Sequence, residues 1–453
     1  MEPSATGGPS VPSGGPDGNG RPTATGEKGP AGSRGLPYRA VGFLRRLSPG
    51  FTLMLVRRAL HGLASNLSVQ YNSIFATALG ANPVQLGSLQ SVGNAFGAVV
   101  AVPAGWVIDS YGLRRVFLVG TVLLVASNLL YFWADQWMYL YPAIILFYMG
   151  TRITCTCCTV TCATELRNDQ RATGRGLCRS LSSVVALATP MLAAWAVSSW
   201  GGVNAEGIRP LYAVRTGIFA AILVLLAVLV RGRPSSTSPG VSRSLFTDFA
   251  EVFKHGPDTL RLMLMIALMD LPWSMTQPFS PLFAHQYKAA DEFVLGGIAV
   301  AGSFATLLAA IPLGRLADRR GRKRCLFLIA PLAYGANLCL VFAPGPSTLL
   351  LSGLLFGFNS ISMGIALAMA AEVVPKSQMG RWTGAISLVR GLVSIPAPLL
   401  GGMIWDHVGP IYVFFTAIAI DVVLRLPLLA SMRETLHLDM EDAPPSDRAG
   451  GGP

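Results

Sequence analysis

The sequence predicts an all-α membrane protein with twelve transmembrane helices in two pseudo-symmetric six-helix bundles. Three observations support this fold class: an apolar composition, a motif that occurs twice, and cations concentrated in alternate turns between apolar runs. Of the 453 residues, 52% are hydrophobic and only 13% are charged, and the mean hydropathy is +0.51. A soluble chain of this length needs far more charge on its surface.

The net charge of the chain is +12, and a strongly basic protein can be a nucleic-acid binder. Here, however, the cations lie between apolar runs, many of which reach the roughly 20 residues that a helix needs to cross a bilayer. Cations in that position indicate membrane topology. We therefore expect the lipid bilayer and a small solute as partners, and no nucleic acid.

The repeated motif reads P-x-G-x-x-x-D-x-x-G-x-[KR]-R, and its two copies occupy 103–115 and 312–324. Each copy lies between two apolar runs, and Asp109 and Asp318 are 209 residues apart. A short charged turn with glycines, which allow unusual dihedrals, predicts a tight hairpin at one membrane face. Its carboxylate suits a helix N-terminus, and its cations suit the cytoplasmic side.

The repeat extends over most of each half of the chain. Three further pairs of identical residues are each separated by 207 positions: Gln70 and Gln277, Gly150 and Gly357, Glu165 and Glu372. A repeat of this length predicts two bundles built on one plan.

The chain divides into five segments by composition. Residues 1–48 are rich in Gly, Pro, Ser and Thr and predict a disordered cytoplasmic tail. The two bundles occupy 49–231 and 258–432, and 433–453 predict a second disordered cytoplasmic tail. Between the bundles, 232–257 predict a cytoplasmic linker with an amphipathic helix. Its pattern leaves open whether that helix lies on the membrane or packs on neighbouring loops.

The twelve spans are predicted near 50–79, 84–104, 116–134, 138–163, 177–200, 210–230, 259–286, 293–313, 325–343, 348–370, 382–404 and 411–430. The first is unusually polar, since Asn66, Gln70 and Ser73 recur at helical spacing and predict one polar face.

The turns between spans predict the orientation. The turns after spans 2, 4, 8 and 10 all carry Arg or Lys, whereas the turns near 80–83, 134–138, 344–347 and 405–410 carry none. Arg209 and Lys288 are the exceptions. Because cations accumulate on the cytoplasmic side, we expect an integral protein of the cell membrane with both termini cytoplasmic.

The seventh span is predicted to be a broken helix that carries a functional carboxylate. Asp270 precedes Trp273, and three prolines follow it within the span. Such breaks are tolerated at membrane depth where the helix faces protein or a wet cavity. Burial favours the protonated carboxyl, which suits proton coupling. A structural ion pair with Arg57, Arg152 or Arg390 explains Asp270 equally well.

Arg152 lies about midway along the fourth span, and its repeat mate Asn359 lies at the same depth in the tenth. Ionisable groups at this depth are costly and are functional candidates by default. Two such positions related by the repeat predict a central binding site. The alternative is that Arg152 is paired with a buried carboxylate for structural reasons.

The two copies of the motif resemble the loops between helices 2 and 3 and between helices 8 and 9 of the major facilitator superfamily. The resemblance covers about 50–430 and implies alternating access, in which the halves rock around a midplane site. It also implies a cytoplasmic gate formed by Gly105, Asp109, Gly112, Arg114, Arg115, Gly314, Asp318, Gly321, Lys323 and Arg324, with Glu165 and Glu372 as partners. In that gate, Asp109 would cap a span of the other half.

The expected function is therefore secondary active transport of a small organic solute, coupled to protons. The alternative is a membrane receptor or sensor that uses the same fold without transport. The expected substrate and coupling residues are Gln70, Gln277, Asn66, Arg152, Asn359, Asp270, Trp273 and Arg390. We expect a monomer.

The sequence contains no motif of a known catalytic site and no Walker motif, so we expect neither an enzyme nor a cofactor. Cys155, Cys158 and Cys162 share one helical face, as copper or zinc ligands could. Small residues are ordinary contacts between membrane helices, so we expect packing there and no metal site.

The balance of charge within the spans favours an anionic substrate. Arg57, Arg58, Arg152 and Arg390 outnumber Asp270 and Asp421, and arginine forms charge-assisted hydrogen bonds with carboxylates. Asp421 and Arg425 are four residues apart and are expected to pair with each other. We therefore expect an organic anion anchored by Arg152. The alternative is that the aspartates neutralise two arginines and the others reach the lipid headgroups, which would leave a neutral or amphipathic substrate.

Overall fold

The computed structural model describes residues 49–101, 103–165, 171–229, 257–373, 379–432 and 434. The expected tail 1–48 and the linker helix within 232–257 lie outside this part. The side chains of Asp109, Glu165 and Glu372 also lie outside the described part, because only the backbone is described at these three positions.

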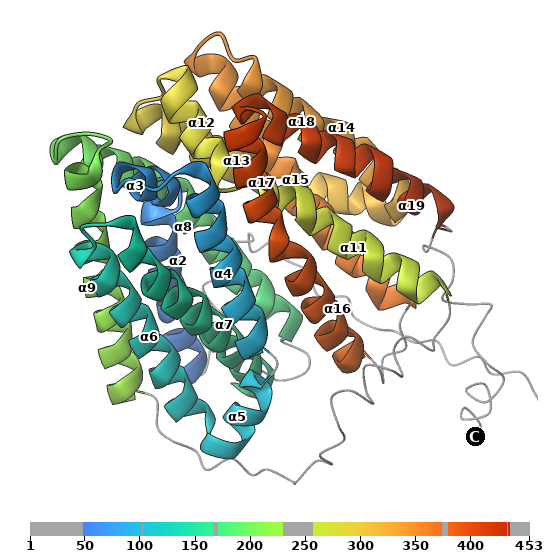
Figure 1. The fold of residues 1–453 in the computed structure, drawn as a ribbon. Helices are drawn as coiled ribbons and strands as arrows, with labels where there is room; N and C mark the ends of the chain where they lie inside the picture. The colour runs from blue at the N-terminus through green and yellow to red at the C-terminus, as the bar shows by residue number, and fades with distance from the viewer. Residues whose placement is uncertain are drawn as a thin grey trace, which may run out of the picture. The chain divides into compact units, whose positions relative to one another are not determined.

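The described residues are almost entirely helical (Figure 1). The first half contains α2 (Pro49–Ser68), α3 (Asn72–Ala78), α4 (Pro83–Ala101), α5 (Ala104–Tyr111), α6 (Leu113–Trp133), the short 3-10 helix η1 (Trp137–Tyr139), α7 (Leu140–Glu165), α8 (Arg171–Ser199) and α9 (Ala205–Leu229). The second half contains α11 (Pro257–Thr276), α12 (Phe279–Lys288), α13 (Glu292–Arg320), α14 (Arg322–Val341), α15 (Pro346–Val373), α16 (Met379–Ser394), α17 (Pro396–His407), α18 (Pro410–Ile420), the π-helical η2 (Asp421–Arg425) and α19 (Leu426–Ser431).

These helices form the twelve spans of two six-helix bundles, because several spans consist of two consecutive helices. Span 1 is α2 with α3, span 2 is α4 with α5, and span 7 is α11 with α12. Among the described residues, nine segments are apolar and long enough to cross a membrane. The three spans outside that set are spans 1, 2 and 7, whereas span 11, which consists of α16 and α17, lies within it.

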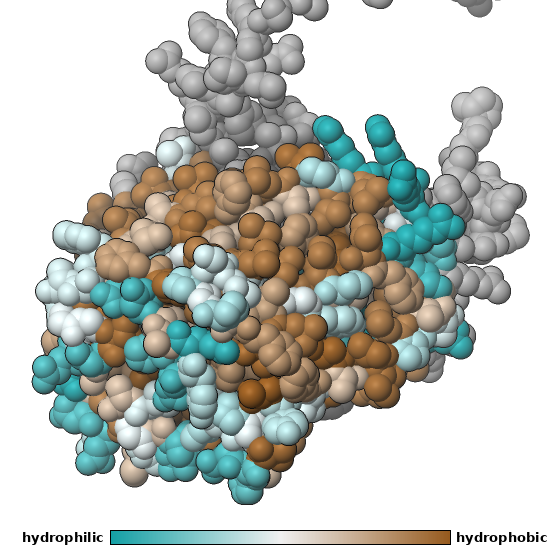
Figure 2. Space-filling view, turned by 90° about the horizontal axis from the view of Figure 1, so that it is seen from above, coloured by the Kyte–Doolittle hydropathy of each residue, from teal (hydrophilic) through white to brown (hydrophobic). Residues whose placement is uncertain are grey.

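The surface has the composition that a bilayer requires. Figure 2 shows a broad apolar face with hydrophilic side chains gathered at its margins. Val99, Trp195 and Val228 are each more than 65% exposed, although apolar patches of this extent are rare on soluble proteins. The chain is thus an integral membrane protein by both its helices and its surface.

The two ends of the bundles differ in how the halves meet. We call the end with the turns at 79–82 and 408–409 the short-turn end, and the end with Gly112 and Gly321 the motif end. Towards the short-turn end, one hydrophobic cluster includes residues of both halves, among them Tyr71 and Phe283. Towards the motif end, each half has a separate cluster. The halves are therefore joined at the short-turn end.

Glycines make this junction tight. Helix α4 packs on α16 and α17, and α8 packs on α13. A methyl group added at Gly402 would lie 2.9 Å from Val84 Cα, and one at Gly87 would lie 3.0 Å from Leu399 Cα. Hydrogen bonds also join the halves here, among them those from Asn94 Nδ2 to Ser394 O (3.0 Å) and from Leu399 N to Ser91 Oγ (3.2 Å).

Gly402→Ala tests this junction. We expect the variant to lose about 1–3 kcal/mol of stability, because the added methyl group meets backbone atoms of the other half that have little freedom to move. The measurement is the midpoint of thermal unfolding in detergent. Gly217→Ala is the matched control, since an added methyl group at Gly217 meets nothing within 4 Å. An equal midpoint for the two variants would contradict the tight junction.

Candidate functional site

Spans 1 and 7 bend at the two glutamines that the repeat relates. Gln70 lies in the turn between α2 and α3, and Gln277 lies between α11 and α12. Both line one cavity of about 160 Å³, which we call the interface pocket. The other residues that line it are Val69, Ser280, Pro281, Leu295, Ile298, Ala299, Leu340, Ser352 and Phe356. The structure thus brings two predicted site residues from opposite halves to one place.

Gln70, which lines the interface pocket, has an unsatisfied acceptor in its side chain. Gln70 is only 5% exposed. Its Nε2 donates to Pro190 O in a long hydrogen bond of 3.4 Å. Its Oε1 is buried and has no hydrogen-bond partner among the described residues. A buried acceptor without a donor costs about 1–3 kcal/mol.

A second cavity of about 280 Å³, the side pocket, includes Trp273 in its wall and shares five residues with the interface pocket: Gln277, Ser280, Ile298, Ala299 and Phe356. It lies between α11, α13 and α15, where glycine and hydroxyl residues form the wall: Gly302, Ser303, Thr306, Gly353, Gly357 and Ser360. Trp273 is 40% exposed, and its ring meets that of Phe356 edge to face at 5.7 Å. An aromatic edge beside small polar side chains suits an amphipathic solute.

Three predicted residues lie elsewhere. Asn66 Nδ2 donates to Gly62 O of its own helix at 2.8 Å. Arg152 is exposed and lies against Gly97 of α4. Asn359 lines a cavity inside the second bundle, in which Arg152 takes no part. The structure therefore does not place Arg152 and its repeat mate in one described cavity.

Asp270 and Arg390 form an ion pair between α11 and α16. Arg390 Nε donates to Asp270 Oδ2, and Arg390 NH2 donates to Asp270 Oδ1 at 3.1 Å. The two side chains are 16% and 31% exposed. Of the three arginines considered for Asp270, it is Arg390 that pairs with it. A carboxylate and a guanidinium that remain partly accessible can exchange this contact for a proton or for a solute.

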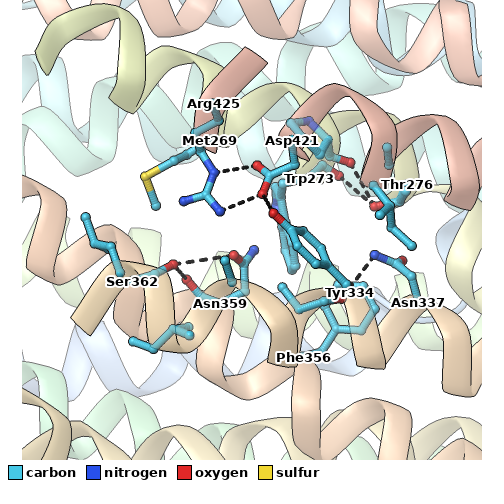
Figure 3. A pocket seen from close by; sticks show the side chains of 17 residues that line it. Met269, Trp273, Thr276, Tyr334, Asn337, Phe356, Asn359, Ser362, Asp421 and Arg425 are labelled. Atoms are coloured by element: carbon cyan, nitrogen blue, oxygen red, sulfur yellow. Dashed lines mark hydrogen bonds and ion pairs between the residues drawn. The ribbon is translucent and has the colours of Figure 1, made fainter. Parts of the chain in front are cut away.

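The cavity inside the second bundle contains a more deeply buried pair (Figure 3). Asp421 accepts two hydrogen bonds of 2.5 Å from Arg425 and a third from the Tyr334 hydroxyl. The pair lies in η2, and the cavity has a volume of about 40 Å³. That volume can hold a few water molecules and is too small for an organic solute. The expected pairing of Asp421 with Arg425 is confirmed.

One buried cation escaped the sequence analysis. Arg215 of α9 is 2% exposed, and its NH1 donates to Ser68 Oγ at 2.5 Å. The arginines counted within the spans did not include Arg215, although its position in the apolar segment 210–230 was enough to predict a buried cation. Arg57 is also buried, at 1% exposed, and lies over the Phe117 ring. It therefore does not extend to the lipid headgroups.

The two copies of the motif make equivalent contacts within their own halves. Arg114 NH2 donates to Ala227 O near the end of α9, at 2.5 Å. Lys323 Nζ donates to Ala430 O and Met432 O near the end of α19, at 2.7 and 2.6 Å. Cations at the carbonyl end of a helix interact favourably with its dipole. In each half, the motif thus binds the end of the sixth span.

The glycines of the motif have backbone angles that require glycine. Gly112 has φ +85° and Gly321 has φ +105°, in the region where a side chain is strained. Beside Gly321, the Glu434 carboxylate accepts from Arg322 N at 2.8 Å and Lys323 N at 3.3 Å. This partner of the motif was not predicted, because Glu434 was placed in the disordered tail.

The remaining gate residues are described only in part. Asp318 lies 3.6 Å from its neighbour Arg322 and is 68% exposed, and Arg115 and Arg324 are exposed. Gly105 and Gly314 lie in α5 and α13. Among the described residues, no group of three His, Cys, Asp or Glu side chains could hold a metal ion.

A family model described as the Major Facilitator Superfamily matches residues 53–288 and 262–434, almost the whole described chain. The chain belongs to this superfamily. The Tetracycline resistance protein, class H, of Pasteurella multocida is 26% identical over 177 residues, which are 38% of this chain and 44% of that protein. The Multidrug resistance protein MdtG of Escherichia fergusonii is 28% identical over 172 residues, 37% and 42% of the two chains.

An uncharacterised MFS-type transporter of Mycobacterium tuberculosis is 29% identical over 139 residues, 30% of this chain and 19% of that protein. The match thus spans about a fifth of this relative and less than half of the other two. Among solved structures, the nucleoside transporter NupG has a TM-score of 0.66 at 12% identity, covering 84% of this chain and 99% of the other. A POT family transporter in complex with 5-aminolevulinic acid has a TM-score of 0.65 at 14% identity, covering 86% and 96%. At these identities the structures establish the fold alone.

The Asp421–Arg425 pair allows a test of the buried charges. Asp421→Asn should cost about 3–5 kcal/mol of stability, because it leaves the Arg425 guanidinium buried without its counter-charge. The double variant Asp421→Leu with Arg425→Met should recover most of that loss, since both charges are then removed. The measurement is the thermal unfolding midpoint, with Asp135→Asn as a control at an exposed ion pair. A double variant no more stable than the single one would refute this assignment.

Proposed function

We propose that the protein is a secondary transporter that moves a small organic solute by alternating access, with the interface pocket as the central binding site. One observation carries this proposal: Gln70 and Gln277, matched by the repeat and each at the bend of a broken span, line the same cavity between the halves. Transport sites in such folds lie at the interface of the repeats, where helices are interrupted. The family and its transporter relatives support membrane transport as the general activity.

The structure fits one stage of such a cycle. The halves share a hydrophobic cluster at the short-turn end and have separate clusters at the motif end. By the distribution of cations, the motif end is the cytoplasmic one. We therefore assign this arrangement to a state open towards the cytoplasm, in which the motif residues contact their own halves. In the opposite state, Asp109 would cap a span of the other half.

Asp270 is the proposed coupling group. Its pair with Arg390 joins spans 7 and 11, whose helices α11 and α16 pack against each other, and remains partly accessible. Protonation of Asp270 would remove one partner of this pair and release Arg390. Proton binding would thereby be linked to a rearrangement between two spans that also contact the first half or the interface pocket.

The substrate charge depends on Arg152. Arg390 and Arg425 are neutralised by aspartates, Arg58 Nε donates to Ser182 Oγ at 3.1 Å, and Arg57 is buried. These contacts remove three of the four arginines that favoured an anion. Arg152 remains exposed and does not line the interface pocket, so the proposal of an organic anion rests on this one guanidinium outside the pocket.

Flux measurements in sealed proteoliposomes, with and without a pH gradient, test transport and coupling together. We expect the wild type to accumulate its solute only with the gradient. Asp270→Asn should abolish accumulation and retain exchange of solute across the membrane, because its neutral side chain cannot release a proton. Asp135→Asn, at an exposed pair of the short-turn end, should behave as the wild type. Absence of any solute flux in the wild type would refute transport, and accumulation by Asp270→Asn would remove Asp270 from coupling.

A thermal-shift screen of the purified protein against organic anions, cations and neutral solutes tests the substrate class. We expect anions to raise the unfolding midpoint of the wild type, and Arg152→Gln to weaken anion binding about tenfold or more, because a charge-assisted hydrogen bond is lost. Arg319→Gln is the matched control, since Arg319 is an exposed arginine outside the proposed site and gate. Stabilisation by cations or neutral solutes alone would contradict an anionic substrate.

A further inference from the structure

The bend in span 1 lacks the usual chemical cause of a helix break. Span 7 breaks directly before Pro278, which has no N–H to donate and therefore cannot continue the helical hydrogen bonds. Span 1 breaks at Val69–Tyr71, and the segment from Ser68 to Asn72 contains neither proline nor glycine. Sharp bends need an identifiable cause. In span 1, the cause must be sought in contacts with other helices.

Two side chains of α9 hold the two sides of this bend. Arg215 NH1 donates to the hydroxyl of Ser68, the last residue of α2, at 2.5 Å. The Tyr212 hydroxyl donates to Oδ1 of Asn72, the first residue of α3, at 3.0 Å. Because Tyr212 and Arg215 are three residues apart, they project from the same face of their helix. Together they bridge the non-helical turn that carries Gln70.

The environment of Arg215 indicates that it is retained for more than stability. Its guanidinium carbon lies 5.3 Å from the centre of the Phe147 ring and 5.6 Å from that of Tyr212. Its Nε has no hydrogen-bond partner among the described residues, and the described side chains bonded to it include no carboxylate. Tyr131 stacks on Tyr212 at 4.7 Å. A cation buried in this way is costly in a membrane protein and marks a functional position.

The second half has no such cation at the matching place. The beginnings of spans 6 and 12 align through three pairs that are each 200 residues apart: Pro210 and Pro410, Tyr212 and Tyr412, Thr216 and Thr416. This alignment places Phe415 opposite Arg215. The second half, which has Pro278 at its bend, therefore has a phenylalanine at this position. The first half, which has no proline at its bend, has Arg215 there.

We propose that Arg215 and Tyr212 are positioning residues that impose the bend in span 1 and so present Gln70 to the interface pocket. The effect of this positioning on transport rests on the proposed function, whereas the role of the two residues in the bend does not. Neither residue lines the pocket. They act through Ser68 and Asn72, and the bend fixes where the unsatisfied Gln70 Oε1 lies.

The test measures the bend directly, without a substrate. Spin labels are attached at Val56→Cys and Ala78→Cys, two exposed positions on α2 and α3, in full-length protein whose native cysteines are replaced. Pulsed electron paramagnetic resonance then reports the distance across the bend. We expect Arg215→Met and Tyr212→Phe each to lengthen or broaden the distance distribution, and Arg215→Lys to restore part of the original one. Tyr131→Phe is the matched control, because it removes a hydroxyl from the stacked ring that takes no part in either contact, and we expect it to leave the distribution unchanged.

The unfolding midpoint separates positioning from a purely structural role. Removal of an unpaired buried cation should leave the midpoint of Arg215→Met equal to or above that of the wild type. If Arg215→Met fails to fold, Ser68→Ala and Asn72→Ala remove the same two hydrogen bonds from the span 1 side and should alter the distribution in the same way. Unchanged distributions in the α9 or span 1 variants would overturn the proposal, and so would a Tyr131→Phe effect as large as that of Tyr212→Phe.

A transport readout follows once the screen has identified a solute. We expect Arg215→Met to raise KM about tenfold, as the loss of one well-placed hydrogen bond does, and Arg215→Lys to recover part of the loss. An altered bend with an unchanged KM would overturn the link to the pocket. A wild type that transports nothing, with the bend still dependent on Arg215, would refute the proposed function and leave the positioning of the bend established.

Discussion

Charged side chains are costly inside a bilayer, and this cost constrains the interior of both bundles. The two halves stabilise their buried charges in different ways. A charged group at membrane depth costs at least about 2.5 kcal/mol unless it finds a partner. The second half pairs its charges: Asp270 with Arg390, and Asp421 with Arg425. Among the described residues, the first half surrounds Arg57 and Arg215 with aromatic rings instead. An excess of positive charge therefore accumulates in the first half.

This asymmetry makes the interiors of the two halves chemically different. The second half compensates buried cations with carboxylates, as in the Asp270–Arg390 pair. The cations of the first half cannot be neutralised in the same way, because arginine keeps its proton under all physiological conditions. They remain a fixed positive charge buried within the first half.

The architecture was predictable wherever local chemistry decides it. The repeat of the motif, the alternation of cations and the apolar runs indicated twelve spans in two bundles, and the prolines of span 7 indicated its break. Contacts between distant segments were not predictable. The bend at Gln70 has no local signal, and Glu434 docks on the motif although its surroundings in the sequence indicate disorder. Arg215 was visible in the sequence, but its partner Ser68 is 147 residues away.

The two bends also differ in what maintains them. Pro278 removes a backbone donor permanently, so span 7 is bent in every state of the protein. The bend of span 1 depends on hydrogen bonds from α9, which any relative movement of α2 and α9 would strain or break. Because the bend carries Gln70, a movement of α2 relative to α9 would also shift Gln70. If the halves rock, the geometry of the interface pocket would therefore change through Gln70 more than through Gln277. The first half would then carry the variable wall of the pocket and the second half the fixed one.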